Sequence, residues 1–311
     1  MKRIFIAVLL ALASMPARAG CGSSSCPIDT HALNGPSQGG FTFDFSVQYL
    51  NQDQPRIGTR DAAVGELAGA HHDEVSTLNR IATAMVGYAP SDRLQFSLSV
   101  PFVSREHHHL GSSHGHARGP ATEHNVVPQS WDINGLGDIV LQGRAAVART
   151  SLWVLGGVKL PTGADDRVNA EGEVGELPIQ PGSGTTDGII GLSWERAAAV
   201  PYFITATYQF RGGETRGYRL GNELQVNAGG AYPLRGNVEA LLQLNSRFRA
   251  RDSGHDAEFT GGTYVYATPG LRWSVGSGAL YALVQLPVVQ DVNAIQLTSH
   301  ANYIVGVQTR F

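Results

Sequence analysis

Histidine is the residue type whose spacing in this chain most suggests chemistry. Eight of the eleven histidines fall in two polar segments, and an acidic pair follows the first two. These residues are His71, His72, Asp73, Glu74, His107, His108, His109, His114, His116 and His124. Neutral imidazoles beside carboxylates suit zinc, copper or nickel, and histidine-rich tracts are interpreted as metal-binding from their composition. We therefore predict contact with zinc or copper and expect no other cofactor, with a solvated polar loop as the alternative.

The chain has two cysteines, Cys21 and Cys26, with Gly-Ser-Ser-Ser between them. In an oxidising compartment such a pair forms a small local disulfide. Two thiolates are also metal ligands, but two sulfur atoms do not complete a tetrahedral site. We therefore expect the disulfide and keep the metal site as the alternative.

Composition and motifs exclude other classes of protein. The 23 Lys and Arg residues face 26 acids, whereas a nucleic-acid binder needs a dense basic face. The sequence has no His-Glu-x-x-His metalloprotease motif, and no glycine-rich phosphate loop follows a strand and opens a helix. We therefore expect neither nucleic-acid binding nor enzyme activity.

The N-terminus predicts export. Lys2 and Arg3 precede an apolar stretch that is too short to span a bilayer, and Ala17-Arg18-Ala19 matches a signal-peptidase site. We predict a signal peptide at 1–19 and a periplasmic segment with the cysteines at 20–40. The expected location is the envelope of a Gram-negative bacterium.

The rest of the chain has the pattern of β-strands. Charged residues make up only 16% of the chain, and glycine occurs 38 times. Phe41 to Tyr49 alternates apolar and polar residues with period two, and 93–103 and 236–249 do the same, although Leu241 interrupts the last pattern. Such alternation is typical of a strand whose two faces meet different surroundings.

Strand length and connection length favour a membrane barrel. Most of the predicted strands have 10 to 14 residues, which suits tilted membrane strands better than strands of soluble proteins. Short turns alternate with long loops, as in outer-membrane barrels. We predict an all-β, antiparallel up-and-down transmembrane barrel over 41–311, with about twelve strands at 41–50, 79–89, 93–103, 136–149, 151–160, 187–196, 201–211, 220–233, 236–249, 263–275, 278–289 and 300–311.

Charged residues fall in phase with the polar face of these strands. Inside a barrel, charges of both signs either line a solute path or pair and close the interior, and the sequence leaves both alternatives open. The predicted lumen residues are Asp44, Asp138, Arg144, Lys159, Asp187, Glu195, Glu223, Glu239, Arg247, Arg249 and Arg272.

The C-terminal strand carries a further pattern. Tyr303, Val305, Val307, Thr309 and Phe311 share one face and end in an aromatic residue. This arrangement resembles the terminal signal through which the barrel-assembly machinery recognises its substrates. That machinery and the lipid of the outer membrane are therefore the expected partners, together with a small solute.

Three motifs carry a family resemblance. Lys159-Leu160-Pro161-Thr162-Gly163 ends one predicted strand, Gln180 to Asp187 leads into the next, and Gly137-Asp138 opens an earlier one. This set resembles the outer-membrane β-barrel family named for the meta-pathway of phenol degradation, whose members are described as transporters. The resemblance runs loosely from 40 to 311 and implies an uptake or efflux barrel.

The predicted function is passage or binding of a small solute. Divalent metal ions are the first candidate, because histidine-rich external loops would capture them before diffusion along the charged lumen. A channel for small aromatic or hydrophobic compounds is the alternative that the resemblance implies. A closed barrel that binds metal at the cell surface is the third hypothesis.

Overall fold

The structure is a single barrel of twelve long antiparallel strands. The computed structural model describes residues 40–66, 72–112, 126–147, 150–254 and 257–311. The predicted signal peptide and the cysteine pair lie outside these residues. The barrel strands are β1 (Gly40–Gln52), β4 (His72–Ser91), β5 (Leu94–Ser112), β7 (Ile139–Ala146), β8 (Leu152–Leu160), β9 (Asp187–Arg196), β10 (Tyr202–Phe210), β11 (Glu223–Pro233), β12 (Val238–Arg249), β13 (Gly262–Val275), β14 (Gly278–Thr298) and β15 (Asn302–Arg310).

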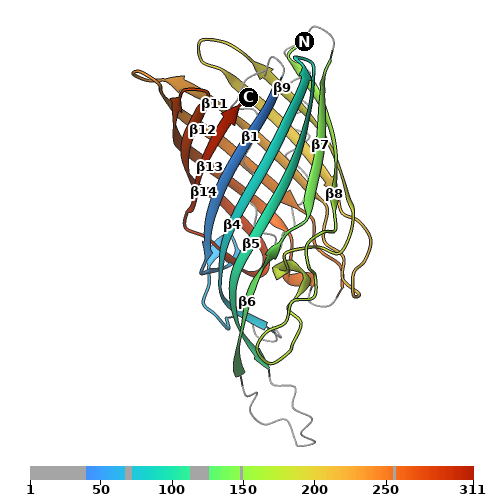
Figure 1. Cartoon of the computed structure of the whole chain (residues 1–311). Coiled ribbons are helices and arrows are strands. Elements are labelled where there is room, and N and C mark those ends of the chain that lie inside the picture. The colour runs from blue at the N-terminus through green and yellow to red at the C-terminus, as the bar shows by residue number, and fades with distance from the viewer. Residues whose placement is uncertain (1–39, 67–71, 113–125, 148–149, 255–256) are drawn as a thin grey trace, which may run out of the picture.

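The sheet closes on itself. Each barrel strand pairs with the next one along the chain, and β1 pairs with β15 (Figure 1). Lipid offers no partners to backbone N–H and C=O groups, so a sheet can cross a bilayer only when it has no open edge there. The predicted up-and-down barrel is confirmed.

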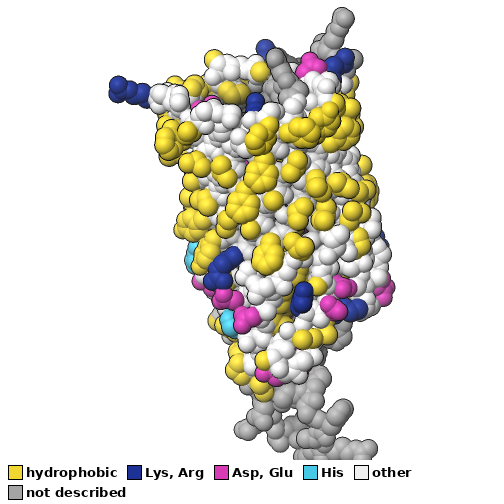
Figure 2. Space-filling model, in the orientation of Figure 1, with side chains coloured by type: hydrophobic (Ala, Val, Ile, Leu, Met, Phe, Trp, Pro, Cys, Tyr) yellow, Lys and Arg dark blue, Asp and Glu magenta, His cyan; other side chains and the backbone are white. Residues whose placement is uncertain are grey.

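Alternate residues of each strand meet different surroundings. On β1, Asp44 and Ser46 are buried inside the barrel, whereas Phe45 and Val47 are exposed on the outer wall. The same alternation around the barrel produces the band of apolar side chains in Figure 2. This band is the surface that contacts lipid, and the chain is a transmembrane barrel of the Gram-negative outer membrane.

Helices contribute little to the described part of the chain. It contains the single-turn 3-10 helices η3 (Leu177–Ile179) and η4 (Ala257–Phe259). No helix there is long and apolar enough to cross a bilayer.

The two ends of the barrel differ. The turns between β4 and β5, β7 and β8, β9 and β10, β11 and β12, and β13 and β14 are short, and Phe311 lies at this end (Figure 1). The longer connections gather at the opposite end. Short turns are periplasmic and long loops are extracellular in outer-membrane barrels. The exposed Phe311 is therefore periplasmic, and its recognition by the assembly machinery stays a prediction.

Several segments predicted as loops are strands. β5 continues to Ser112, and β6 (Val126–Leu136) pairs with it inside the predicted loop 104–135. At the same end β14 continues to Thr298 and pairs with β2 (Gln54–Gly58), which pairs with β3 (Arg60–Asp61). These extensions lie beyond the apolar band, where the outward face of a strand is polar, as at Ser130 and Asp132 of β6. Hydrophobic alternation therefore does not mark them in the sequence.

A charge on the lipid-facing wall tests the orientation of the strands. Val305 is exposed on the outer wall, directly opposite Val47 of β1. We expect Val305→Arg to destabilise the folded barrel by about 2–4 kcal/mol, because the guanidinium would enter hydrocarbon. Denaturant titration of the protein refolded in vesicles measures this free energy. The matched change Ser97→Arg, on the inner face of β5, should cost clearly less, and equal costs would contradict the assigned orientation.

Candidate functional site

The structure places the eleven predicted lumen residues on the inner face of the barrel wall. Ten of them form ion pairs in the described part of the chain, and Asp44 is the exception. Away from the main group, Glu195 pairs with Arg144, and Glu239 pairs with Arg272. The interior is therefore a paired ionic network more than a row of free charges.

The largest part of this network is an ionic seam at the extracellular ends of β7 to β12. It consists of Asp138, Lys159, Asp187, Arg211, Glu223 and Arg247. Lys159 Nζ lies 2.5 Å from Asp138 Oδ2 and 3.3 Å from Asp187 Oδ2. Charges alternate in sign along the seam, so each group is held by neighbours of opposite charge.

Arg211 joins the two halves of the seam. Its Nη1 lies 3.0 Å from Asp187 Oδ2, and its Nη2 lies 3.6 Å from Glu223 Oε2. Arg247 Nε then donates to Glu223 at 2.9 Å. Arg211 was not among the predicted lumen residues, although it is in phase with Thr207 and Gln209 on the polar face of β10. This periodicity was the signal that could have found it.

The family-like motifs form a clasp at the base of the loop 161–186. The carboxylate of Asp138 accepts hydrogen bonds from the backbone N–H groups of Gly163 and Ser183, each at 3.0 Å. Gly163 and Gly182 approach so closely that a Cβ on Gly182 would lie 2.2 Å from Gly163 O. Only glycine fits this contact, which explains why the motifs carry it at both positions.

The loop that the clasp closes packs against the β5–β6 extension. Ile179 is buried with Trp131 and Ile133 of β6. Arg105 of β5 donates to the carbonyl oxygens of Pro178 and Gln180 at 3.3 and 3.4 Å. This role of Arg105 was not predicted, because the residue falls in a segment that was predicted as a solvated loop.

A second anchor lies in the loops beyond β10 and β12. Asp252 accepts hydrogen bonds from Arg249 at 2.8 Å and from the Tyr218 hydroxyl at 2.7 Å. Burial and the nearby Asp252 carboxylate raise the pKa of the Tyr218 phenol. Tyr218 therefore stays protonated and remains a hydrogen-bond donor at any physiological pH.

On one side of the barrel, buried side chains fill the interior. A buried apolar cluster consists of Ala231, Leu241, Tyr281, Leu283 and Ile304. Next to it, buried amides and hydroxyls bond to one another: Asn245 donates to Asn227 at 3.0 Å, and Thr268 donates to Asn245 at 2.6 Å. Leu241, which interrupts the alternation in the sequence, belongs to the apolar cluster.

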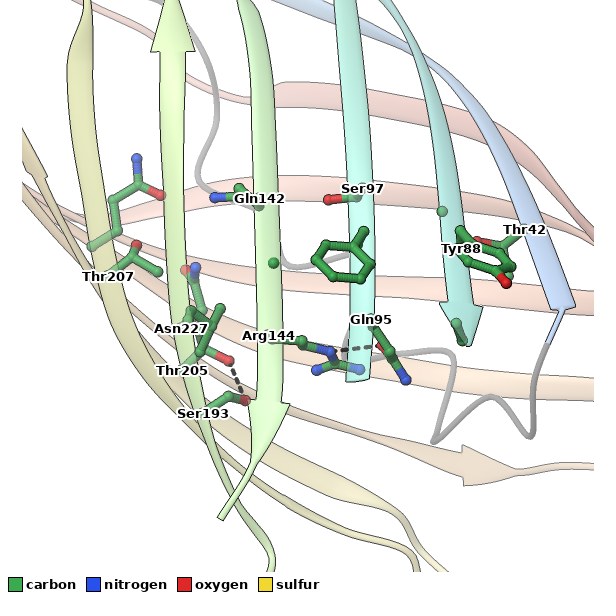
Figure 3. A pocket seen from close by; sticks show the side chains of 16 residues that line it. Thr42, Tyr88, Gln95, Ser97, Gln142, Arg144, Ser193, Thr205, Thr207 and Asn227 are labelled. Atoms are coloured by element: carbon green, nitrogen blue, oxygen red, sulfur yellow. Dashed lines mark hydrogen bonds between the residues drawn. The ribbon is translucent and has the colours of Figure 1, made fainter. Parts of the chain in front are cut away.

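The other side of the interior contains a cavity of about 170 Å³. Figure 3 shows its lining, which comes from β1, β4, β5 and β7 to β11. The polar lining residues are Thr42, Gln95, Ser97, Gln142, Arg144, Ser193, Thr205, Thr207, Gln225 and Asn227. Amide and hydroxyl groups therefore dominate its polar surface.

Arg144 is the single charged residue of this lining, and three side chains contact its guanidinium group. It pairs with Glu195, donates to Gln95 Oε1 at 2.7 Å, and stacks over the Trp153 ring with its Cζ 4.5 Å from the centroid. The cavity therefore offers hydrogen bonds but no free positive charge.

The predicted metal ligands are only partly described. His71, His114, His116 and His124, together with the side chain of His72, lie outside the described residues. His107 and His109 are buried on the inner face of β5, and His108 is exposed on the outer face. The three consecutive histidines therefore lie on a strand and do not converge on one ion.

The register brings one pair of predicted ligands together. Glu74 of β4 lies directly opposite His109, while Asp73 lies opposite Leu110. His109 Nε2 is 2.6 Å from Gln129 Oε1, and His107 Nδ1 is 2.8 Å from Thr77 Oγ1. Within the described ranges no three His, Cys, Asp or Glu residues are grouped to hold a metal ion.

The fold is similar to solved outer-membrane barrels. An outer membrane channel from Pseudomonas putida F1 shares 11% identity, with 91% of this chain and 100% of that chain covered and a TM-score of 0.61. The translocator domain of the autotransporter NalP from Neisseria meningitidis shares 11% identity over 90% of this chain and 91% of its own, with a TM-score of 0.48. The CymD monoaromatic hydrocarbon channel shares 9% identity over 94% and 98%, with a TM-score of 0.47.

No protein-family model and no curated protein matches the chain. At identities of 9 to 11% the structural likeness shows the fold alone. The chain is therefore an outer-membrane β-barrel, and its solute has to be inferred from the interior.

The ionic seam predicts that breaking a buried ion pair costs much more folding stability than breaking an exposed one. Lys159→Met leaves Asp138 and Asp187 buried without their shared cation, and we expect a loss of roughly 3–5 kcal/mol of stability. Arg80→Met, which breaks an exposed pair with Glu106, should cost about 1 kcal/mol or less. Denaturant titration of the refolded variants measures both values. Similar losses would show that the seam does not stabilise the barrel.

Zinc binding at the extracellular rim stays a prediction, and the strand geometry makes it specific. We expect His109→Ala to weaken zinc binding, because His109 shares a face with Glu74, whereas His108→Ala should leave it unchanged. Isothermal titration of the detergent-solubilised protein with zinc measures both affinities. Equal effects of the two changes would contradict a site on the inner face.

Proposed function

We propose that this barrel is an outer-membrane channel for small uncharged solutes. The observation that carries the proposal is the cavity lined by β1, β4, β5 and β7 to β11, whose polar lining consists of hydroxyls and amides with a single, neutralised charge. Such groups exchange hydrogen bonds with a passing solute and hold no fixed counter-ion.

The ionic seam supports the same solute class. Its charges already have partners, so an entering ion gains little from them and loses part of its hydration in a confined interior. A neutral solute loses much less on entering. The pairs therefore stabilise the wall while leaving neutral passage favoured over that of ions.

Small aromatic compounds that carry a hydroxyl group are the first class to test. A ring of this kind suits a cavity of about 170 Å³, and Leu155 adds an apolar surface beside the polar lining. The resemblance to the phenol meta-pathway family points in the same direction. The similar barrel from Pseudomonas putida F1 is likewise described as an outer membrane channel.

Metal-ion transport is not part of this proposal. It would require free ligands along the path, and the predicted lumen charges other than Asp44 are engaged in ion pairs in the described structure. A histidine-rich rim that binds zinc or copper is compatible with the channel as a separate surface property.

Liposome swelling with phenol-like and sugar-like neutral solutes tests the proposal. We expect Ser97→Trp to reduce swelling strongly, because Ser97 lines the cavity and an indole would fill much of it. Leu98→Trp is the matched control, because Leu98 lies next in sequence on the lipid-facing wall. Absence of swelling with the unmodified protein, or equal effects of the two variants, would overturn the proposal.

A further inference from the structure

The polar side chains that line the cavity differ in whether the protein itself bonds them. Six of them take part in side-chain hydrogen bonds: Gln95, Arg144, Ser193, Thr205, Gln225 and Asn227. The other four make no side-chain hydrogen bond within the described part of the chain, and they are Thr42, Ser97, Gln142 and Thr207. Each of these four is partly exposed. In the described structure their donors and acceptors are therefore available to a solute.

Two of the available side chains are direct neighbours. Ser97 of β5 lies opposite Gln142 of β7 in the sheet, and Figure 3 shows the two side by side on adjacent strands. The Cβ atoms of such opposite residues are about 4.5–5.5 Å apart. Both residues line the cavity, so one small molecule can contact both side chains.

Glycines flank this pair on both sides in the sheet. Gly87 of β4 lies opposite Ser97, and Gly157 of β8 lies opposite Gln142. A Cβ on Gly157 would lie 2.8 Å from Gln142 Cγ, so the stem of Gln142 occupies space that a side chain there would need. The two adjoining strands therefore place no side chain beside the pair at this level.

The pair offers hydrogen bonds without charge. The Ser97 hydroxyl donates and accepts, and the Gln142 amide has two N–H donors and an acceptor oxygen. Since the register fixes their separation, the pair discriminates between solutes by the spacing of their polar groups. Neighbouring hydroxyls reach both side chains at once, whereas hydroxyls on opposite sides of a ring reach one. Leu155 of β8 supplies an apolar surface in the same cavity for the carbon body of the solute.

We propose that Ser97 and Gln142 form a two-point binding site for uncharged solutes with hydroxyls on adjacent carbons. This inference rests on the proposed channel function and names a solute class for it. A solute with adjacent hydroxyls makes one hydrogen bond more than an isomer whose hydroxyls are far apart. One such bond corresponds to about a fivefold difference in affinity.

Two isomers of cyclohexanediol test this proposal, one with hydroxyls on adjacent carbons and one with hydroxyls on opposite carbons. They have the same atoms and nearly the same volume, so they differ mainly in hydroxyl spacing. We expect the unmodified protein to bind the adjacent isomer about fivefold more tightly. Saturation-transfer NMR titration of the detergent-solubilised protein measures both affinities, with protein-free micelles as the blank.

The variants Ser97→Ala and Gln142→Met should each abolish this preference. Neither side chain bonds to another residue of the described structure, so we expect both variants to fold like the unmodified protein, which denaturant titration checks. Ser99→Ala is the matched control, because Ser99 is the next residue on the same face of β5 and lies outside the cavity lining. It should keep the preference.

Equal binding of the two isomers by the unmodified protein overturns the proposal. A preference that survives in both Ser97→Ala and Gln142→Met also overturns it, as does a preference lost in Ser99→Ala.

Failure of this proposal is distinguishable from failure of the channel function. A protein that swells liposomes with neutral solutes but binds both isomers equally retains the channel function and refutes the two-point site. A protein that prefers the adjacent isomer through Ser97 and Gln142 without swelling liposomes retains the site and refutes the channel. Absence of both results refutes both proposals.

Discussion

The closed hydrogen-bonded sheet is the constraint on which the rest of this structure depends. A strand in hydrocarbon has to pair on both edges, so β1 has to meet β15 and every residue has to face either lipid or the interior. Phe45 faces outward because Asp44 faces inward, and the same relation holds around the wall. Polar side chains are thereby confined to the inner face of the sheet. Charged groups there can pair only with one another or with a solute.

The inner surface of the barrel has two parts that differ in packing. On the β11–β15 side, apolar side chains around Leu283 and bonded amides around Asn245 fill the space. On the side of β4 to β10, smaller residues such as Ser97 and Thr207 leave a cavity that β1 and β11 also border. The seam through Lys159 and Asp187 lies at the extracellular end of that side. The packed wall thus fills one part of the interior, and the other part contains the cavity.

The sequence was informative wherever one strand face met lipid. Alternation from Phe41 to Tyr49 predicted the strand, its orientation and the inward position of Asp44. It failed beyond the membrane, where β5 has polar residues on both faces and the apolar residues Trp131 and Ile133 of β6 face inward, so Arg105 and His107 were assigned to a loop. The partners of the charges also could not be predicted, because pairing depends on register. The link from Arg211 to both Asp187 and Glu223 joins three strands that the sequence leaves unconnected.

The contact between Gly163 and Gly182 also has an evolutionary consequence. It ties the two ends of the segment 161–186 together at the barrel wall, with Asp138 bonded to both sides. The residues between them are a module that is held at this base and again where Ile179 packs against Trp131 and Ile133 of β6. The exposed tip of the module lies around Glu171 and Gly172. Insertions or deletions at the tip of that module leave the strand register unchanged. The length of this extracellular loop can thus change independently of the transmembrane wall.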